Sequence, residues 1–172
     1  GNYAGLVLIP AFRDAGVVLK TVVSSGGVSS VHFGKKHGFE VATTEVSVVM
    51  EDPSINTVVI ATRHDTHARF FIEALKRGKH VFCEKPLCLT LEELDEVEAT
   101  WRALDEHGDA PVLMVGFNRR FAPQVQKLES LLDGVNEPAS FIMTVNAGEI
   151  PIDHWTQDPE IGGGRIIGEV CH

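Results

Sequence analysis

The stretch TVVIATRHDTHARFFIEALKRGKHVFC, residues 57–83, decides the fold. It opens with TVVIA at 57–61, a continuous run of β-branched and apolar residues that is typical of a strand buried on both faces. Residues 64–77 repeat apolar side chains at helical spacing, and Gly78 follows where a helix commonly ends in a left-handed residue. HVFC at 80–83 predicts a second strand. A strand, a helix and a strand in succession indicate a βαβ unit and therefore a parallel sheet.

The same alternation runs through most of the chain. Ser29 or Ser30 is expected to cap one further helix, and Thr90 with Glu93 has the spacing of a capping box before another. The pattern predicts a doubly wound α/β fold, in which ligands bind at the carboxyl ends of the strands. The additional strands are expected at 19–24, 41–42 and 112–117, and the additional helices at 6–15 (interrupted by Pro10), 28–37, 45–50 and 91–106.

The pattern of buried strands and amphipathic helices changes from Ala122 onward. We expect a helix at 123–132, followed by a half-buried strand of a different sheet at 139–145, where apolar side chains alternate. The chain is therefore divided into an incomplete dinucleotide-binding domain, residues 1–118, and the beginning of a substrate or oligomerisation domain, residues 119–172.

Composition narrows the class of protein. The 172 residues are 44% hydrophobic and 23% charged, which is typical of a globular protein and excludes a disordered or coiled-coil chain. No apolar run approaches the ~18 residues of a membrane span. Fifteen Lys and Arg against 24 Asp and Glu give a net charge of −9 with no basic stripe, which argues against a nucleic-acid partner. Three cysteines without CxxC spacing favour reduced thiols, so we expect a cytoplasmic protein with no membrane or nucleic-acid partner.

Ten residues, GKHVFCEKPL at 78–87, resemble the strand-and-turn signature of the Gfo/Idh/MocA family, the glucose–fructose oxidoreductase and inositol dehydrogenase group. VIATRHDTH at 59–67 is similar to the family's fourth strand and following turn. NRRFAP at 118–123 is similar to its exit from the nucleotide domain. Gly162–Gly164, followed eight residues later by His172, resemble its active-site helix.

The resemblance implies an oxidoreductase that uses NAD or NADP and acts on sugars, inositols or nucleotide sugars. Lys85 matches the family's catalytic or substrate-orienting lysine, and a partly desolvated lysine at a strand end can have a lowered pKa. Without the resemblance, Lys85 reads as an exposed turn residue. The Lys85–Pro86 bond is expected to be cis, and His172 matches the family's catalytic proton acceptor. Many members carry Asp where this chain has Gly168, and that Asp orients the imidazole of the catalytic histidine. In this chain either the carboxylate partner of His172 is lost, or Glu169 takes its place through a local distortion of the helix.

The resemblance also identifies a cofactor site. Gly1-Asn2-Tyr3-Ala4 is similar to the second half of a G-x-G-x-x-G/A fingerprint whose first glycine and strand lie upstream. Because that strand is central, we expect the sheet to split between the strands at 19–24 and 57–61. We also expect a chain truncated at both ends to bind dinucleotide abnormally and to pair its open strands with another chain. Ser24 and Ser25 stand where an acidic residue would hold the ribose of NAD, which leaves NAD against NADP open.

Two histidines and Asp65 lie close enough in sequence to suggest a metal, but the family uses this turn without one, and Asp65 or Thr66 as a helix N-cap explains part of the cluster. We therefore expect no metal. The remaining cofactor contacts implied by the resemblance are Thr62, Arg63, His64, His67, Glu84, Lys85 and Pro86.

Polar and aromatic residues of the second part supply a substrate site. Arg119 and Arg120 can hold a phosphate or sugar hydroxyls with their forked donors, or else form a salt bridge at the domain junction. The resemblance further implies a homo-oligomer; a non-catalytic dinucleotide-binding sensor or scaffold is the alternative function. The expected substrate contacts are Lys85, Arg119, Arg120, Asn146, His154, Trp155 and His172.

Overall fold

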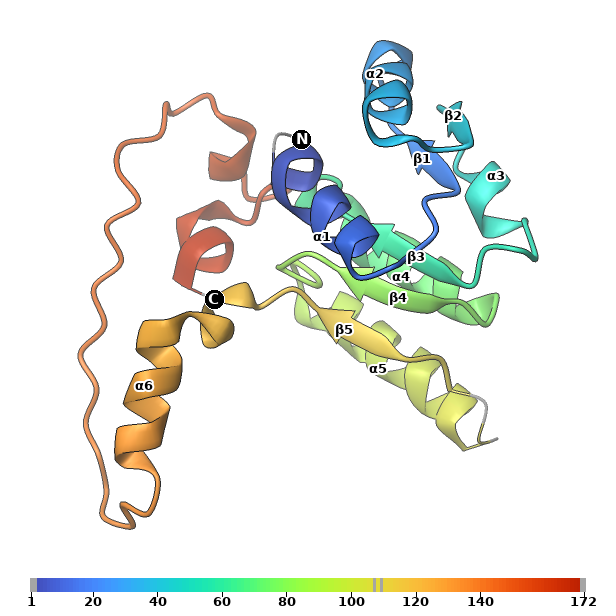
Figure 1. Cartoon of the computed structure of the whole chain (residues 1–172). Coiled ribbons are helices and arrows are strands. Elements are labelled where there is room, and N and C mark those ends of the chain that lie inside the picture. The colour runs from blue at the N-terminus through green and yellow to red at the C-terminus, as the bar shows by residue number, and fades with distance from the viewer. Residues whose placement is uncertain (1–2, 107, 109, 171–172) are drawn as a thin grey trace.

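The computed structural model describes residues 3–106, 108 and 110–170. Its strands lie in two parallel sheets (Figure 1). In one sheet, β1 (Thr21–Val23) pairs with β2 (Val41–Thr43). In the other, β3 (Thr57–Ile60), β4 (His80–Cys83) and β5 (Leu113–Val115) lie side by side in chain order. The predicted parallel α/β fold is confirmed.

The sheet is divided where the sequence predicted. Within the described residues β1 and β3 share no hydrogen-bonded ladder. The helical segment near the start of the chain contacts both pieces. Phe12 packs edge-on against Phe82 of β4 with ring centroids 5.3 Å apart, and a side chain added at Gly5 would lie 2.2 Å from Phe33 beside β1. This segment therefore joins two sheets that do not pair with each other.

The helix expected at 6–15, with an interruption at Pro10, is present as two joined segments. A π-helical turn at Ala4–Leu8 runs into α1 (Ile9–Asp14), and the Ile9 N–H donates to the carbonyl of Ala4, five residues back. Pro10 lies in the first turn of α1. Because proline has no N–H and its ring crowds the preceding turn, the ordinary helical ladder is interrupted there.

Helices α4 (His67–Lys76) and α5 (Leu91–Asp105) cover one face of the β3–β4–β5 sheet (Figure 1). Phe71 and Leu75 of α4 are completely buried, as is Cys83 of β4. This cluster is the main core of the chain, and it fixes α4 and β4 relative to each other. The start of α4 and the end of β4 are consequently held in place by the same packing.

The predicted helix caps are partly confirmed. Thr90 accepts from the Glu93 N–H at 3.1 Å and Glu93 accepts from the Thr90 N–H, which is the expected capping box. The cap expected from Ser29 or Ser30 is wrong, because the N-cap residue of α2 (Gly27–His37) is Gly26 and both serines lie within the first turn of the helix. Ser30 donates to the carbonyl of Gly27 instead.

Two further boundaries differ from expectation. The helix expected at 64–77 begins as a 3-10 turn, His64–Thr66, and Thr66 makes no side-chain cap at the start of α4. Asp65 has no capping role there either. The helix expected at 45–50 is the single turn α3 (Ser47–Met50).

The strand predicted at 139–145 is wrong. A 3-10 turn, Asn118–Phe121, leads into α6 (Pro123–Leu132) as expected, but residues 136–150 form no regular structure. No strand of the described chain lies beside them, so an extended segment there has no partner for its backbone groups. Ile142 in this segment is 97% exposed.

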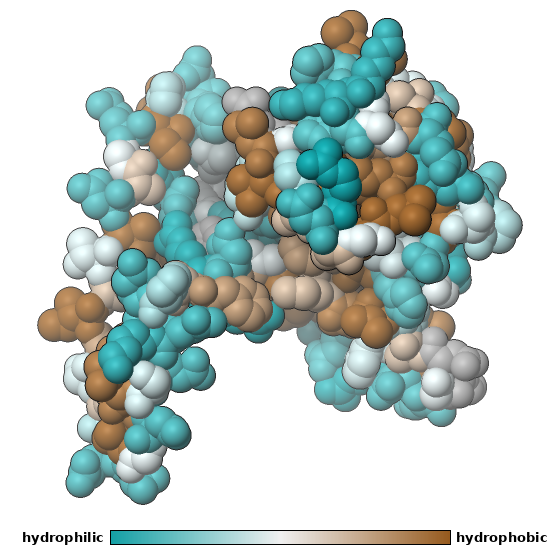
Figure 2. Space-filling view, in the orientation of Figure 1, coloured by the Kyte–Doolittle hydropathy of each residue, from teal (hydrophilic) through white to brown (hydrophobic). Residues whose placement is uncertain are grey.

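The chain then returns to the carboxyl edge of the sheet. Figure 1 shows the irregular segment running outside α6 and turning back toward β3 and β4, where a 3-10 turn (Trp155–Gln157) and a π-helical turn (Ile166–Val170) lie. In Figure 2 the arm that contains α6 stands apart from the main body and carries exposed apolar side chains. Among the described helices, none has the length and apolar character needed to cross a bilayer.

Candidate functional site

The site begins with the register of two strands. Ile60 lies opposite Cys83 in the parallel pair of β3 and β4, and the Glu84 N–H donates to the Ile60 carbonyl at 2.9 Å. Parallel strands end at the same edge of a sheet, so the residues that follow β3 and β4 lie together. Thr62 and Lys85 are thereby brought to one edge.

His67 lies behind this edge and not on it. The residue is 1% exposed, and its Nδ1 lies 2.6 Å from the carbonyl oxygen of Pro86. Its Nε2 lies 3.3 Å from the carbonyl oxygen of Thr62. A residue expected to contact the cofactor is therefore buried between the two strand ends. The Lys85–Pro86 peptide bond is cis, as predicted.

His64 carries the next connection. Its Nδ1 lies 2.8 Å from the carbonyl of Gly162, and the Asp65 N–H donates to the carbonyl of Ile161 at 3.1 Å. Because a carbonyl only accepts, Nδ1 carries the hydrogen. Burial is the main cause that lowers the pKa of His64, and the nearby Lys85 charge acts in the same direction. The imidazole thus donates from Nδ1 to the Gly162 carbonyl and holds the glycine-rich segment on the turn.

The glycines permit this close approach. A side chain at Gly162 would lie 2.4 Å from Thr156 Cα and 2.6 Å from the Trp155 carbonyl oxygen, both of which are backbone atoms. Gly163 has φ of 73°, a region that L-residues rarely adopt, and a side chain there would lie 2.7 Å from Leu89. The three-glycine segment is therefore needed for the chain to fold back over the edge of the sheet.

Lys85 meets the end of this returning segment. Its Nζ donates to the carbonyl of Gly168, which is buried in the π-helical turn. The neighbouring Glu169 pairs with Arg119 at 3.2 Å between Nη2 and Oε2. The local distortion considered for this helix is present, and it directs Glu169 to Arg119. Of the two interpretations of Arg119, the structure contains the salt bridge at the junction.

Glu84 completes the edge. One of its oxygens, Oε1, is buried and has no hydrogen-bond partner among the described residues, and burial raises the pKa of this carboxyl although Lys85 opposes the shift. A side chain at Gly116 would lie 2.8 Å from that oxygen, so Gly116 leaves room for Glu84. The adjacent Cys83 has its pKa raised to about 12 by burial, which makes its thiol an inert core group.

Trp155 lies against the turn that follows β3. Its ring is edge-on to His64 with centroids 4.8 Å apart, and the Arg63 guanidinium lies 5.9 Å from the indole centre. Thr62 and Arg63 are exposed at the same place. The half-buried indole thus offers part of an aromatic surface beside exposed polar groups, which suits a sugar ring.

Other predicted substrate residues lie elsewhere or bond locally. His154 Nδ1 is 2.8 Å from Thr156 Oγ1 at the start of its own turn. Arg120 lies over the ring of Phe121 at 4.7 Å, and Asn146 is exposed in the irregular segment, where it accepts from the Gly148 N–H. The structure does not bring these three side chains into contact with Lys85.

The predicted cofactor residues near the start of the chain are only partly described. Gly1 and Asn2 lie outside the described residues, as does His172. The Tyr3 hydroxyl accepts from Asn118 Nδ2 at 2.9 Å, a contact between residues 115 positions apart that no local pattern reveals. Ala4 begins the π-helical turn. Ser24 and the exposed Ser25 follow β1, at the carboxyl end where a ribose would be held.

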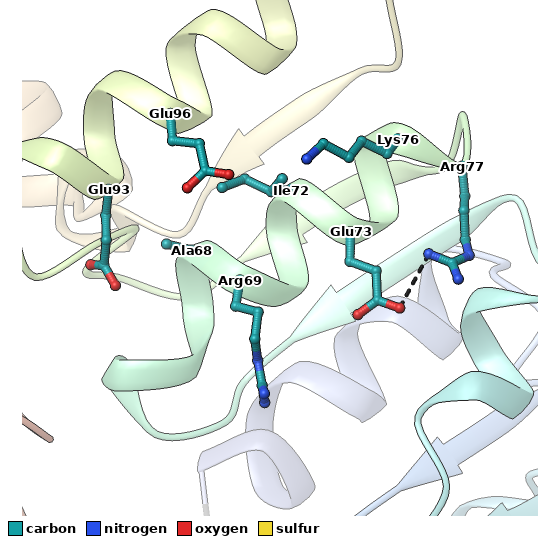
Figure 3. A pocket seen from close by; sticks show the side chains of 8 residues that line it. All are labelled: Ala68, Arg69, Ile72, Glu73, Lys76, Arg77, Glu93 and Glu96. Carbon is teal, nitrogen blue, oxygen red and sulfur yellow. Dashed lines mark ion pairs between the residues drawn. The ribbon is translucent and has the colours of Figure 1, made fainter.

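A separate groove lies between α4 and α5 (Figure 3). Charged side chains of both signs line it, among them Arg69, Glu93 and Glu96, and Glu73 pairs with Arg77 at 3.1 Å. It lies on the helix-covered face, and no predicted site residue lines it. The carboxyl edge of β3 and β4 is therefore the candidate site.

A parallel α/β sheet with a polar edge of this kind is the architecture of the ligand-binding doubly wound domains, which include the dinucleotide-binding ones. Residues 1–117 match GFO_IDH_MocA, an oxidoreductase family with an NAD-binding Rossmann fold. The chain belongs to this family, which confirms the resemblance found in the sequence.

Two curated relatives are similar to this chain in sequence. The chain is 36% identical over 142 residues to myo-inositol 2-dehydrogenase of Thermotoga maritima, covering 80% of this chain and 40% of that protein. It is 31% identical over 166 residues to levoglucosan dehydrogenase of Pseudarthrobacter phenanthrenivorans, covering 90% of this chain and 40% of that protein. The chain thus spans less than half the length of these relatives.

The fold has a solved counterpart as well. The crystal structure of KijD10, a 3-ketoreductase from Actinomadura kijaniata in complex with NADP and TDP-benzene, superposes with a TM-score of 0.76 at 22% identity. The match covers 98% of this chain and 51% of that protein. At this identity the likeness establishes the fold alone.

The glycine-rich segment gives the first prediction. Gly162→Ala should displace the segment, because the new methyl group meets backbone atoms of Thr156 and Trp155. Overpacking costs about 1–3 kcal/mol, so local opening should rise about fivefold or more. Limited proteolysis followed by mass spectrometry measures the rate of cleavage within residues 150–170.

Gly168→Ala is the matched control, since no atom of the described residues outside the backbone of its own turn lies within 4 Å of a side chain at that position. It should be cleaved at the wild-type rate. Equal cleavage of the two variants would contradict the close-approach argument.

Proposed function

We propose that the protein at its full length is an oxidoreductase that transfers a hydride between NAD or NADP and a secondary alcohol of a sugar, inositol or nucleotide sugar. The observation that carries the proposal is the position of Lys85. It follows β4 beside the Thr62 turn, and its Nζ donates to the carbonyl of Gly168 in the returning segment. Membership of an NAD-binding oxidoreductase family supports the same conclusion.

The chemistry requires two groups. Oxidation of a secondary alcohol removes a hydride from carbon and a proton from oxygen, and the nicotinamide, when bound, exchanges the hydride. Lys85 orients the hydroxyl through its ammonium group or, as the neutral amine, accepts its proton. The Gly168 carbonyl fixes the direction of Nζ. His172 is proposed as a second proton acceptor from its place in the sequence after the glycine-rich segment.

The cofactor is proposed to lie along the carboxyl edge. Thr62 and Arg63 are exposed after β3, and Glu84 carries a carboxyl oxygen that lacks a protein partner among the described residues. Ser24 and Ser25 after β1 are proposed to hold the adenosine ribose or its 2′-phosphate. Gly1 to Ala4 are proposed to approach the pyrophosphate.

The substrate is proposed to stack on Trp155. The names of the curated relatives, a myo-inositol dehydrogenase and a levoglucosan dehydrogenase, support a polyhydroxylated ring. Arg119 acts through its pair with Glu169 at the edge of this site. Asn146 stays a proposed substrate contact, which a movement of the irregular segment would have to bring in. Arg120 in the 3-10 turn after β5 and His154 before the Trp155–Gln157 turn stay proposed substrate contacts as well.

The division into a dinucleotide-binding part, 1–118, and a substrate part, 119–172, is part of this proposal. A homo-oligomer is proposed because α6 and the segment after it expose large apolar side chains, among them Leu131 and Ile142. A cytoplasmic location is proposed from the cysteine pattern, three residues with no CxxC spacing.

A non-catalytic sensor or scaffold is the second candidate. Gly168 favours it, since no carboxylate stands at that position to orient a catalytic histidine. The named relatives are dehydrogenases, which favours the enzyme.

Lys85→Ala tests the enzyme directly. In the full-length protein it should reduce kcat by about 100-fold or more, because proton transfer by a positioned side chain contributes about 10²–10⁴-fold. Nicotinamide absorbance with a panel of inositols, anhydrosugars and nucleotide sugars measures the rate.

Lys127→Ala is the control, an exposed lysine on α6 that should leave the rate unchanged. Wild-type turnover by the Lys85→Ala variant would contradict the assigned role. Cofactor binding by the wild type without hydride transfer to any compound of the panel would favour the sensor.

Ser24→Asp tests the cofactor site. A carboxylate at the end of β1 bonds the ribose 2′-hydroxyl of NAD and repels the 2′-phosphate of NADP. The ratio of the Kd for NADP to the Kd for NAD should rise about tenfold, which is ~1.4 kcal/mol. Fluorescence titration with the reduced cofactors measures both constants. Ser24→Asn, similar in size and uncharged, should change the ratio far less; an equal change in both variants would remove Ser24 from the site.

A further inference from the structure

One buried imidazole connects the two strand ends that form the site. His67 lies 1% exposed at the first position of α4, and its two ring nitrogens face carbonyl oxygens from different loops. Nδ1 is 2.6 Å from the carbonyl oxygen of Pro86, and Nε2 is 3.3 Å from that of Thr62. These residues are 19 and 5 positions away from His67 along the chain.

The ring has little freedom to move. The main chain of His67 belongs to α4. Two later residues of this helix, Ala68 and Phe71, are buried in the core. The ring of His64 also lies nearby, with its centroid 5.6 Å from the centroid of the His67 ring. A side chain held in this way transmits the position of α4 to whatever it bonds.

The two contacts are unequal. A carbonyl oxygen accepts hydrogen bonds, and the 2.6 Å separation assigns a hydrogen to Nδ1. The bond to Pro86 is therefore the stronger link, and Pro86 is the residue directly after Lys85. The 3.3 Å approach of Nε2 to the Thr62 carbonyl oxygen is the longer contact, and no hydrogen bond is assigned to it.

We propose that His67 is a positioning residue that sets where Lys85 lies relative to the turn after β3. It acts through the Pro86 carbonyl and does not itself reach a substrate or a cofactor, since it is buried. The proposal rests on the proposed function in one respect only, because turnover is one of its two readouts.

Two amide variants separate the contacts. In His67→Asn the amide nitrogen occupies the place of Nδ1 and keeps the bond to Pro86. In His67→Gln the amide nitrogen lies nearer the place of Nε2 and keeps the approach to Thr62 while losing Pro86. The two side chains carry the same group, so a difference between them reports which carbonyl matters.

Turnover by the full-length protein is the first readout. His67→Asn should keep kcat within about threefold, whereas His67→Gln should lose about 100-fold, the effect of misplacing a catalytic group by about 1 Å. The KM for the cofactor should change much less than kcat in both variants. Rates are normalised to the folded fraction from circular dichroism, so that a loss of stability alone does not count. Equal kcat in the two variants would overturn the proposal.

Chemical modification of Lys85 is the second readout and needs no turnover. Mass spectrometry follows acylation of Lys85 by a small amine-reactive ester, with the exposed Lys127 as the internal reference. His67→Gln should change the Lys85 rate several-fold relative to Lys127, and His67→Asn should not. An unchanged rate in His67→Gln would overturn the proposal. A wild-type protein that turns over no sugar, but whose Lys85 rate depends on His67, would reject the proposed function and retain the role of His67.

Discussion

The parallel pairing of β3 with β4 is the constraint on which the rest of the site depends. Because Ile60 lies opposite Cys83, the chain leaves both strands at the same level, and Thr62 and Lys85 come to one edge although they are far apart in sequence. Packing of α4 on these strands, with Phe71 and Leu75 fully buried, keeps the two ends at a fixed separation. A shift of one residue in this register would turn the side chains to the opposite faces and separate the site.

The second half of the chain adds to this edge by backbone contacts. The carbonyls of Gly162 and Gly168 meet His64 and Lys85, and glycine at 162 lets the backbone come close enough to do so. Carbonyl acceptors leave little trace in sequence, since any residue carries one. The charged pair Arg119–Glu169 fixes the same segment to the 3-10 turn that follows β5.

Much of this arrangement could be predicted where the cause is local. The β-branched run at 57–60, the apolar face of α4 and the Thr90 capping box each depend on neighbours within a few residues, and the structure contains all of them. The division of the sheet followed from the strand order of the fold. The expected strand at 139–145 is not observed. An alternating apolar pattern indicates which face of a strand would be buried, but it does not provide the neighbouring strand that its backbone must pair with. The burial of His67 was missed because a histidine near a strand end resembles a ligand contact until its neighbours are placed.

The nicotinamide is proposed to lie at the edge after β3 and β4, with Lys85 beside its reacting carbon. A crystal structure of the full-length protein with the reduced cofactor and a bound inositol or sugar tests it most directly. The substrate hydroxyl should lie within hydrogen-bond reach of Lys85 Nζ, about 2.6–3.2 Å, with the nicotinamide against the turn after β3 that contains Thr62. A nicotinamide bound elsewhere, such as in the groove between α4 and α5, or a Lys85 side chain that points away from the substrate, would contradict it.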